Sequence, residues 1–476
     1  MTPAVRELSP APGVTAALAS FAADGPVLFD SSAAGEVRGR YSYLTADVRP
    51  APVAAVREAV AGFGFGAETA DGLPPLRGGA VGLWCYEEGR RFERLPKPKS
   101  LTVAERNGGR RAVLGPRASV TAVADWVLAW DHAAGRAWVV CHGGPAVRGT
   151  APPPTAADRL RWVLDRLDAG PPPMAEPAGP PFVPDLPAVP GFPGAFCPFT
   201  RAAYEAAVVR AVEYVRAGDI FQVNLAQPLL VPRPAGEDWR PLYGRLRAAN
   251  PAPFGGIWSA GAGPPVLSAS PERFLSVTPD AAGRLHAEAR PIKGTRPRSP
   301  DPAEDAAAAA DLLASGKDLA ENVMIVDLLR NDLSKVCEPH SVRVPALCDL
   351  ESYATVHHLV SEVRGTLRAG ADAWDLLGAA FPGGSITGAP KVRAMEIVRE
   401  LEPAARGAYC GSMFWVGFDG AMDANILIRT VQPHPAGLAA AWVGGGITAK
   451  SDPAAEYEET LDKAAATLRA LGVERA

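Results

Sequence analysis

The order of helix and strand signals is the feature that most restricts the fold of this chain. The second half opens with a helix that has Thr200 as its N-cap and Gly218 as its stop signal, and several strand-like segments follow through about Val277. Further helices are predicted over 302–336, 390–397 and 453–471. Because helices and strands come in mixed order rather than strict alternation, the pattern favours an α+β fold with antiparallel sheets over a doubly wound parallel sheet.

The predicted strands fall in both halves of the chain. They cover 26–30, 121–130, 137–141, 413–418, 424–430 and 438–443, where apolar, aromatic and β-branched residues are bounded by turn residues. The pair 121–130 and 137–141 is expected to form a hairpin with a turn around Asp131 to Gly135.

Three regions follow from the composition along the chain. Residues 1–143 are mixed strand and loop, 144–196 are a connector rich in proline and glycine, and 197–476 hold the longer helices. One helix is expected in the connector, from about Ala156 to Leu167, with Thr155 as its N-cap. A connector of this kind is a linker or an excursion and does not by itself establish independent domains.

Composition excludes several classes of function. The net charge of -4, without a long block of either sign, gives no sign of a nucleic-acid or anionic-membrane partner. The N-terminus lacks the apolar run of a signal peptide, and no window approaches a membrane span. The six cysteines form no C-x-x-C pair, so neither a zinc site nor a disulfide framework is indicated, and free thiols suit a cytoplasmic protein.

Lys293 is the first candidate catalytic residue. It lies in the run Arg290-Pro291-Ile292-Lys293-Gly294-Thr295-Arg296-Pro297-Arg298, which suits neither an ordinary helix nor an ordinary strand. Like charges on both sides disfavour the protonated amine and so favour a nucleophile. Taken alone, the run is more typical of a solvated basic loop.

Acidic residues on two predicted helices indicate a possible metal site. Glu456 and Glu459 share one helical face, and Lys463 lies one turn further along it. Glu321 begins an apolar helical stretch, where a buried carboxylate is costly unless it is paired or bound to a metal. Carboxylates from two helices form a hard oxygen site that suits Mg2+. The structural alternative is a surface ion-pair ladder between Glu459 and Lys463.

Neighbouring polar residues have a structural interpretation. Asp327, Arg330, Asn331 and Asp332 are expected to form a buried Asp–Arg network between helices. His357 and His358 would point to opposite faces of a strand, so at most one of them lines a given pocket and the other is a satisfied core histidine.

Small-residue loops supply candidate binding groups for an anion. Residues 381–391 lead into a helix with Pro390 in its first turn, and its N–H groups with the Ser385 and Thr387 hydroxyls would form an anion-binding nest. The glycines 444–446 follow a predicted strand, and Arg429 ends another as a plausible carboxylate clamp. Together these features suggest a small substrate with more than one carboxylate, assisted by Mg2+.

These motifs occur together in a known order. The segments 218–225, 270–274 and 290–298, the Glu321 helix, 385–391 and 444–463 closely resemble the chorismate-utilising enzymes. The resemblance covers about 199–471 and extends to 77–93. It implies two antiparallel β-sheets packed as a sandwich with helices outside, the fold of anthranilate synthase component I.

The resemblance also implies roles for single residues. Glu321 and Glu459, with Glu456 nearby, would bind the Mg2+ that holds the ring carboxylate of chorismate, and Glu272 would protonate the departing C4 hydroxyl. The remaining implied substrate contacts are His358, Ser385, Thr387, Tyr409, Arg429, Gly445, Gly446 and Lys463.

Lys293 separates branches within the family. Lysine at this position resembles the para-aminobenzoate branch, in which it attacks C2 and ammonia then attacks C4, whereas anthranilate synthases usually carry alanine. Gln222 stands where isochorismate synthases typically have a lysine that activates water. The resemblance further implies a separate glutamine amidotransferase subunit as the source of ammonia, and leaves tryptophan binding by the first half open. The alternatives are an anthranilate synthase, an isochorismate synthase and a non-catalytic chorismate-binding protein.

Overall fold

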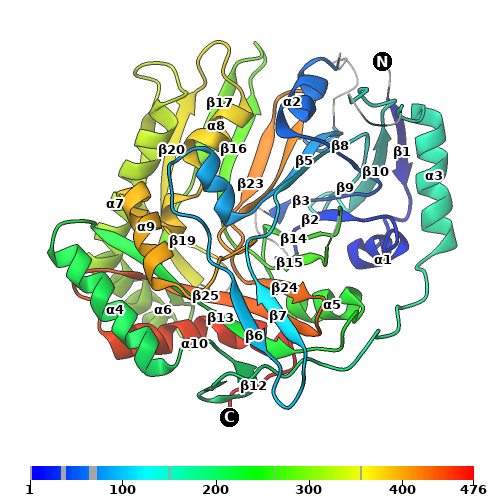
Figure 1. Cartoon of the computed structure of the whole chain (residues 1–476). Coiled ribbons are helices and arrows are strands. Elements are labelled where there is room, and N and C mark those ends of the chain that lie inside the picture. The colour runs from blue at the N-terminus through cyan, green and yellow to red at the C-terminus, as the bar shows by residue number, and fades with distance from the viewer. Residues whose placement is uncertain are drawn as a thin grey trace.

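Two antiparallel β-sheets and a surrounding set of helices make up the protein. The computed structural model describes residues 3–33, 39–63, 72–147, 150, 152–261, 263–353 and 356–476. The two sheets splay apart in Figure 1, and helices lie along the outside of both. The predicted α+β class is therefore confirmed.

Sheet A is the larger sheet, with 13 strands. Its order is β1 (Ala4–Leu8), β10 (Arg136–Cys141), β9 (Trp126–Asp131), β3 (Tyr41–Thr45), β2 (Val27–Asp30), β14 (Gly255–Trp258), β15 (Val266–Ser268), β24 (Thr430–His434), β25 (Leu438–Ile447), β13 (Gln222–Pro232), β12 (Phe192–Phe196) and β11 (Ala188–Val189), with β21 (Gly388–Ala389) paired to β13.

Sheet B has 10 strands. Its order is β18 (Ile292–Pro297), β20 (Val356–Thr366), β17 (Leu285–Ala289), β16 (Arg273–Pro279), β23 (Met422–Asn425), β22 (Ser412–Gly417), β5 (Gly79–Trp84), β8 (Val120–Ala124) and β4 (Arg49–Pro50), with β19 (Arg343–Ser352) paired to β20. A separate hairpin joins β6 (Leu101–Ala104) and β7 (Arg111–Leu114). Both sheets combine strands from the regions 1–143 and 197–476, so these two regions are interleaved rather than stacked as separate units.

The helices cover the two sheets and supply most of the acidic site residues. They are α1 (Val14–Ser20), α2 (Val53–Ala61), α3 (Ala156–Ala169), α4 (Arg201–Arg216), α5 (Trp239–Ala249), α6 (Pro302–Ala314), α7 (Gly316–Ser334), α8 (Ala373–Ala380), α9 (Lys391–Leu401) and α10 (Pro453–Ala470), with the short 3-10 helices η3 (Tyr86–Arg91) and η4 (Gly384–Ile386). α10 packs on β25 of sheet A, whereas α7 packs on β18 and β20 of sheet B. Within the described residues, no helix is long and apolar enough to cross a membrane.

Capping residues account for the helix predictions that are confirmed. Thr155 accepts a hydrogen bond from the Asp158 N–H at the start of α3, and Thr200 accepts one from the Ala203 N–H at the start of α4. The predicted helix 302–336 is in fact two helices, because Ser315 interrupts it and caps α7 by accepting from the Asp318 N–H. Ser315 thus marks a helix boundary, although the alanine-rich sequence before it favours a continuous helix.

Three strand predictions need correction. The segment 121–130 is not one strand, because it breaks at Asp125, and β8 enters sheet B whereas β9 enters sheet A. Asp125 is buried there and pairs with Arg159 of α3. The strand predicted at 424–430 ends at Asn425, and 426–429 cross from sheet B to sheet A. Finally, β25 continues to Ile447, so the glycines 444–446 lie within a strand rather than after it.

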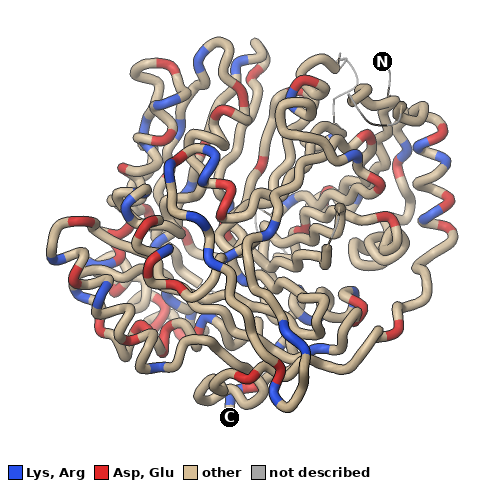
Figure 2. The backbone as a smooth tube through the Cα atoms, viewed as in Figure 1, with Lys and Arg blue, Asp and Glu red and all other residues tan. Residues whose placement is uncertain are grey.

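Charged side chains of both signs are interspersed over the surface. Figure 2 shows Lys and Arg positions interspersed with Asp and Glu positions along the backbone of the helices and the outer loops. This distribution agrees with the small net charge of -4.

All six cysteines are free thiols.

Candidate active site

Glu272, the predicted general acid, contacts Ser385, a predicted substrate-binding residue. Glu272 lies in the turn before β16, and the Ser385 hydroxyl of η4 donates a hydrogen bond of 2.8 Å to its Oε1 atom. Burial raises the pKa of the Glu272 carboxyl, although the Ser385 hydrogen bond and the positive charge of Lys293 act in the opposite direction. A carboxyl with this balance retains its proton at higher pH than an ordinary glutamate, as a general acid requires.

Lys293 lies on β18 within electrostatic reach of two carboxylates. Its backbone pairs with Leu359 of β20, and its charge acts on both Glu272 and Glu459. Lys293 therefore lies near enough to Glu272, just before β16, and to Glu459 of α10 for its charge to act on both. Gly294 follows in a left-handed conformation, with φ +80°, where a Cβ atom would lie 2.7 Å from Leu312 and 2.9 Å from Asp318.

The arginines around Lys293 are each paired with carboxylates. Arg290 pairs with Glu351 and Glu362. Arg296 pairs with Asp311 and Asp318, and Arg298 pairs with Asp305. Each of these three arginines is therefore neutralised by carboxylates from neighbouring elements, which the sequence argument from like charges did not take into account.

Two glutamates and a lysine of α10 face the glycine-rich end of β25. Glu459 Oε1 lies 2.6 Å from the Lys463 amine, which also donates to the Gly444 carbonyl at 3.2 Å. A Cβ atom at Gly445 would lie 3.1 Å from Glu456 Oε2 and 3.6 Å from Glu459 Oε1. The Glu459–Lys463 ion pair, which the sequence analysis gave as the structural alternative to a metal site, is present. It belongs to a cluster of side chains that lies against the backbone of β25.

The two glutamates differ in their electrostatic environment. Burial raises the pKa of Glu456, even though the Ser451 hydroxyl donates a 2.7 Å hydrogen bond to it. Burial alone would also raise the pKa of Glu459, but the charges of Lys463, Lys317 and Lys293 outweigh it and lower that pKa. Glu459 is therefore the better anionic ligand of the pair.

Glu321 lies on a different helix from Glu456 and Glu459. It is half-buried on α7, and within the described parts of the chain it has no ion pair. The described residues contain no ready-made group of three acidic, His or Cys ligands. Lys317, one turn before Glu321, acts on both Glu456 and Glu459 and was missed by the sequence analysis, although the i, i+4 spacing from Glu321 could have indicated it. The donors still fit Mg2+, which retains several waters and takes one or two carboxylates directly.

The two adjacent histidines have different surroundings. His357 is buried and lies 2.7 Å from the Ser352 hydroxyl and 3.0 Å from Asp305, so it is the predicted satisfied core histidine. His358 is half-buried on the other side of β20, where its Nδ1 atom lies 2.8 Å from the Thr295 hydroxyl of the Lys293 strand. A role of His358 beside a substrate ring stays a prediction.

A buried ion pair stabilises the loop around Ser385. Arg406, paired with Glu402, donates to the carbonyls of Ile386 at 2.9 Å and of Asn224 at 2.7 Å. The Asn224 amide in turn donates to the Ser385 carbonyl at 3.1 Å. Thr387 is fully buried and its hydroxyl donates to the Gly383 carbonyl, so this hydroxyl shapes the loop and its predicted contact with substrate has no support here.

The predicted Asp–Arg network on α7 takes a different form. Asp332 is buried and pairs with Lys391 at 2.7 Å and with Lys335 at 2.9 Å. Asp327 and Arg330 make only an exposed pair at 3.4 Å. The expectation of an Asp–Arg network is therefore wrong, because the partner of the buried aspartate comes from α9.

Arg429 and Tyr409 lie near the crossing between the sheets. Arg429 has φ +50° just before β24, and the described residues provide no ion pair for it. Burial of its guanidinium group lowers its pKa. Tyr409 is buried and its ring stacks on Trp442 of β25 at 6.1 Å between ring centroids. An unpaired guanidinium of this kind is suited to an anionic ligand.

Gly446 makes room for a buried side-chain amide. A Cβ atom there would lie 2.2 Å from the Gln222 Nε2 atom, and the Gln222 side-chain amide has no hydrogen-bond partner within the described residues. We expect Gly446→Ala to lower the free energy of unfolding by about 1–3 kcal/mol through overpacking. Urea denaturation checks this, with Gly109→Ala as control, since a Cβ at Gly109 meets nothing within 4 Å. Equal unfolding free energies for the two variants would contradict the expectation.

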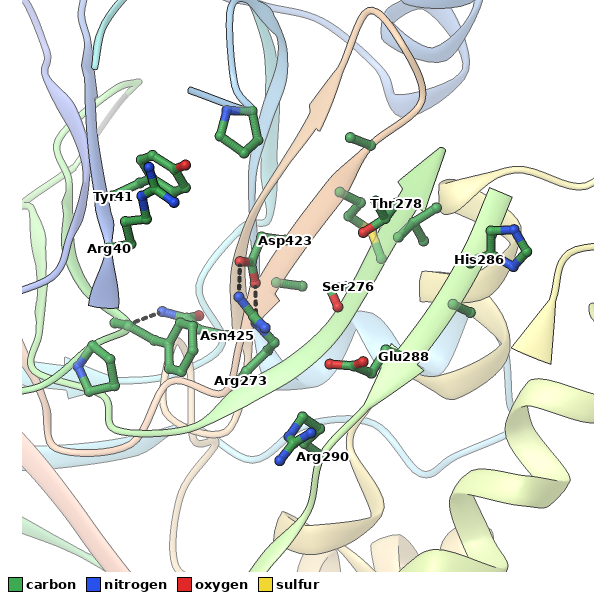
Figure 3. A pocket seen from close by; sticks show the side chains of 18 of the residues that line it. Arg40, Tyr41, Arg273, Ser276, Thr278, His286, Glu288, Arg290, Asp423 and Asn425 are labelled. Atoms are coloured by element: carbon green, nitrogen blue, oxygen red, sulfur yellow. Dashed lines mark hydrogen bonds and ion pairs between the residues drawn. The ribbon is translucent and has the colours of Figure 1, made fainter. Parts of the chain in front are cut away.

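A large cavity is lined by residues of β16, β17 and β23. It has a volume of about 2070 Å3, and none of the predicted site residues lines it. Figure 3 looks into this cavity, where Arg273 of β16 pairs with Asp423 of β23 and where Glu288 and Arg290 also line the wall. The site is better defined by the contacts of Glu272, Lys293 and Glu459 than by cavity size. Tryptophan binding by the first half of the chain stays an open question.

Comparison with known proteins places the chain in one family. The model of the chorismate binding enzyme family matches residues 67–469, and the chain belongs to this family. It is 42% identical over 402 residues to anthranilate synthase component 1 of Streptomyces coelicolor, covering 84% of this chain and 74% of that protein. It is 41% identical over 390 residues to aminodeoxychorismate synthase component 1 of Klebsiella aerogenes, covering 82% of this chain and 76% of that protein.

Solved structures agree with this assignment. Anthranilate synthase component I of Streptococcus pneumoniae superposes with a TM-score of 0.67 at 25% identity, covering 98% of this chain and 92% of that chain. The menaquinone-specific isochorismate synthase of Escherichia coli gives a TM-score of 0.70 at 15% identity, covering 99% of this chain and 95% of that chain, which shows a shared fold. The predicted sandwich of two antiparallel sheets with outer helices is therefore confirmed.

Proposed function

We propose that this enzyme is an aminodeoxychorismate synthase component I, which aminates chorismate to 4-amino-4-deoxychorismate in para-aminobenzoate and folate biosynthesis. The observation that carries the proposal is the convergence of the Lys293 amine and the Glu272 carboxyl, whose pKa is raised by burial. A nucleophile and a proton donor at one site suit displacement of a poor leaving group. Relatives of the same name, 41% and 39% identical, support it.

The proposed reaction is a double displacement. The Lys293 amine forms a bond to C2 while the C4–O bond breaks, and Glu272 gives its proton to the departing oxygen to release water. Ammonia then forms a bond to C4 while the C2–N bond breaks and the electron pair returns to the Lys293 amine. The Glu272 carboxylate takes the surplus proton from the new ammonium group. Neither displacement breaks a bond of the enolpyruvyl ether, so this ether is retained.

The residues around this pair would hold the substrate. Arg429 offers an unpaired guanidinium group to a carboxylate, and Ser385 orients the acid through its 2.8 Å hydrogen bond. Glu321 and Glu459, with Glu456 nearby, would hold Mg2+. When bound, Mg2+ supplies positive charge that anchors a substrate carboxylate. The names of the relatives include the words component 1, which supports a separate partner, and we propose a glutamine amidotransferase subunit that delivers ammonia in the cytoplasm.

An anthranilate synthase is the second candidate, because the 42% identical relative from Streptomyces coelicolor carries that name. In that reaction ammonia attacks C2 directly and pyruvate is released. An isochorismate synthase is less well supported, since the Gln222 amide is no base for activating water.

One incubation distinguishes these candidates. Purified protein, chorismate, MgCl2 and ammonium chloride should give a product with the mass of 4-amino-4-deoxychorismate and no pyruvate. Anthranilate with stoichiometric pyruvate would overturn the proposal, as would a product isomeric with chorismate.

Glu321→Gln is expected to raise the MgCl2 concentration for half-maximal activity by about tenfold or more, because a neutral amide is a weaker ligand for a hard cation than a carboxylate. A MgCl2 titration of the initial rate measures this. Glu338→Gln, a change at an exposed position of the same region, serves as control. An unaltered requirement would remove Glu321 from the ligand set.

A further inference from the structure

The residues that directly follow Glu321 and Glu459 share an unusual environment. Asn322 on α7 and Thr460 on α10 are polar, and both side chains have 0% exposure. Each makes hydrogen bonds to the sheet against which its helix packs. No role has been assigned to either residue so far.

Asn322 joins α7 to the strand that pairs with Lys293. Its amide Nδ2 donates to the Leu359 carbonyl at 3.2 Å, and its Oδ1 accepts from the Ser361 hydroxyl at 2.5 Å. Leu359 is the backbone partner of Lys293, and the Ser361 N–H donates to the Pro291 carbonyl at 3.1 Å. A single buried amide therefore connects the helix of Glu321 to β20, the strand that pairs with the strand of Lys293.

Thr460 makes the corresponding connection between α10 and sheet A. Its hydroxyl accepts a 2.8 Å hydrogen bond from the Gln227 amide of β13 and donates to the Tyr457 carbonyl at 2.7 Å. Gln227 is itself buried, and its oxygen accepts from the Cys197 thiol at 3.4 Å. β13 pairs along its length with β25, which carries Gly445.

Apolar packing alone would not fix these helices so closely. Ile325, Leu329 and Leu333 bury one face of α7, but apolar contact is non-directional and tolerates small rotations and slides. Hydrogen bonds in a buried site are directional, and leaving one partner unpaired there is costly. The buried Asn322 amide therefore restricts the rotation of α7 at Glu321. The buried Thr460 hydroxyl restricts the rotation of α10 at Glu459 in the same way.

We propose that Asn322 and Thr460 are positioning residues that set the spacing of the Glu321 and Glu459 carboxylates relative to Lys293 and Gly445. The inference rests on the proposed function, because it assigns the two carboxylates to a divalent cation. Neither residue touches the cation or the substrate; each acts through the helix that carries its neighbour.

Thr460→Val tests the proposal with little change in shape, since it replaces a hydroxyl by a methyl group. We expect the dissociation constant for Mg2+, measured by calorimetric titration of MgCl2 into the chorismate-free protein, to rise by about 10–100-fold. Thr460→Ser retains the hydroxyl and should restore an affinity near that of the unmodified protein. Asn322→Leu should weaken Mg2+ binding in the same way, and Ser361→Ala provides a second variant if that protein does not fold.

Tyr243→Phe is the matched control. Tyr243 is a buried residue of α5, and its hydroxyl donates a 2.6 Å hydrogen bond to Asp30 of β2, so its loss removes a helix-to-strand bond in which neither α7 nor α10 takes part. It should lower the melting temperature by a similar amount without changing Mg2+ affinity. Unchanged Mg2+ affinity in both Thr460→Val and Asn322→Leu, or an equal loss in Tyr243→Phe, would overturn the proposal.

Two further measurements separate this outcome from failure of the proposed function. If Glu321→Gln weakens Mg2+ binding in the same titration but Thr460→Val and Asn322→Leu do not, the carboxylate role stands and the positioning role fails. If the unmodified protein makes anthranilate, the chemistry proposed for Lys293 fails while the Mg2+ titrations still decide the roles of Asn322 and Thr460.

Discussion

Lys293→Ala is expected to lower formation of 4-amino-4-deoxychorismate by about a thousandfold or more, because the variant has no amine to attack C2 and the covalent route is lost. The initial rate with chorismate, MgCl2 and ammonium chloride, followed by product mass, measures this. In addition, unmodified protein incubated with chorismate in the absence of ammonia should gain a covalent adduct at Lys293, which digestion and mass spectrometry would locate.

Lys97→Ala is the control for this experiment, since Lys97 is exposed and distant in sequence from the site. It should leave both the rate and the adduct unchanged. A Lys293→Ala variant that aminates chorismate at the unmodified rate would contradict the covalent step. A shift of product to anthranilate in that variant would instead agree with Lys293 as the residue that directs ammonia to C4.

Glu272→Gln is expected to lower the same rate by about 10^2–10^4-fold, because the amide has no proton to give to the departing C4 oxygen. The pH dependence gives a second readout. Burial raises the pKa of Glu272, so its protonated form persists to higher pH than in an ordinary glutamate, and the rate should fall as pH rises through that raised pKa. The residual activity of Glu272→Gln should lack this fall.

Ser385→Ala tests the direction of this effect. The Ser385 hydroxyl opposes the burial effect on Glu272, so its removal should raise the pKa of Glu272 further and move the alkaline fall in rate to higher pH. Initial rates across the pH range measure both variants. If the initial rate of Glu272→Gln still falls at alkaline pH, a group other than Glu272 provides the proton.

Much of the fold could be predicted because its signals are local. Thr155 and Thr200 mark helix starts by capping chemistry that depends on neighbouring residues alone, and both helices are present. The break at Asp125 could not be predicted in this way. It depends on Arg159, which lies on a helix 34 residues later in the chain and pairs with the buried carboxylate.

The site shows the same division between local and distant effects. The spacing of Glu456, Glu459 and Lys463 on one helical face follows from 3.6 residues per turn, and the structure has this face. The surroundings of Lys293 were misjudged, because the carboxylates that neutralise Arg290, Arg296 and Arg298 come from other elements. For the same reason the sequence did not predict which charges surround Glu459, since Lys317 and Lys293 come from other elements.

The position of the new carbon–nitrogen bond tests the central proposal most directly. Incubation of the protein with chorismate, MgCl2 and 15N-labelled ammonium chloride, followed by NMR of the unseparated mixture, locates the labelled nitrogen. The double displacement predicts nitrogen on C4 with the enolpyruvyl group still attached. Nitrogen on C2, or labelled anthranilate together with free pyruvate, would contradict it.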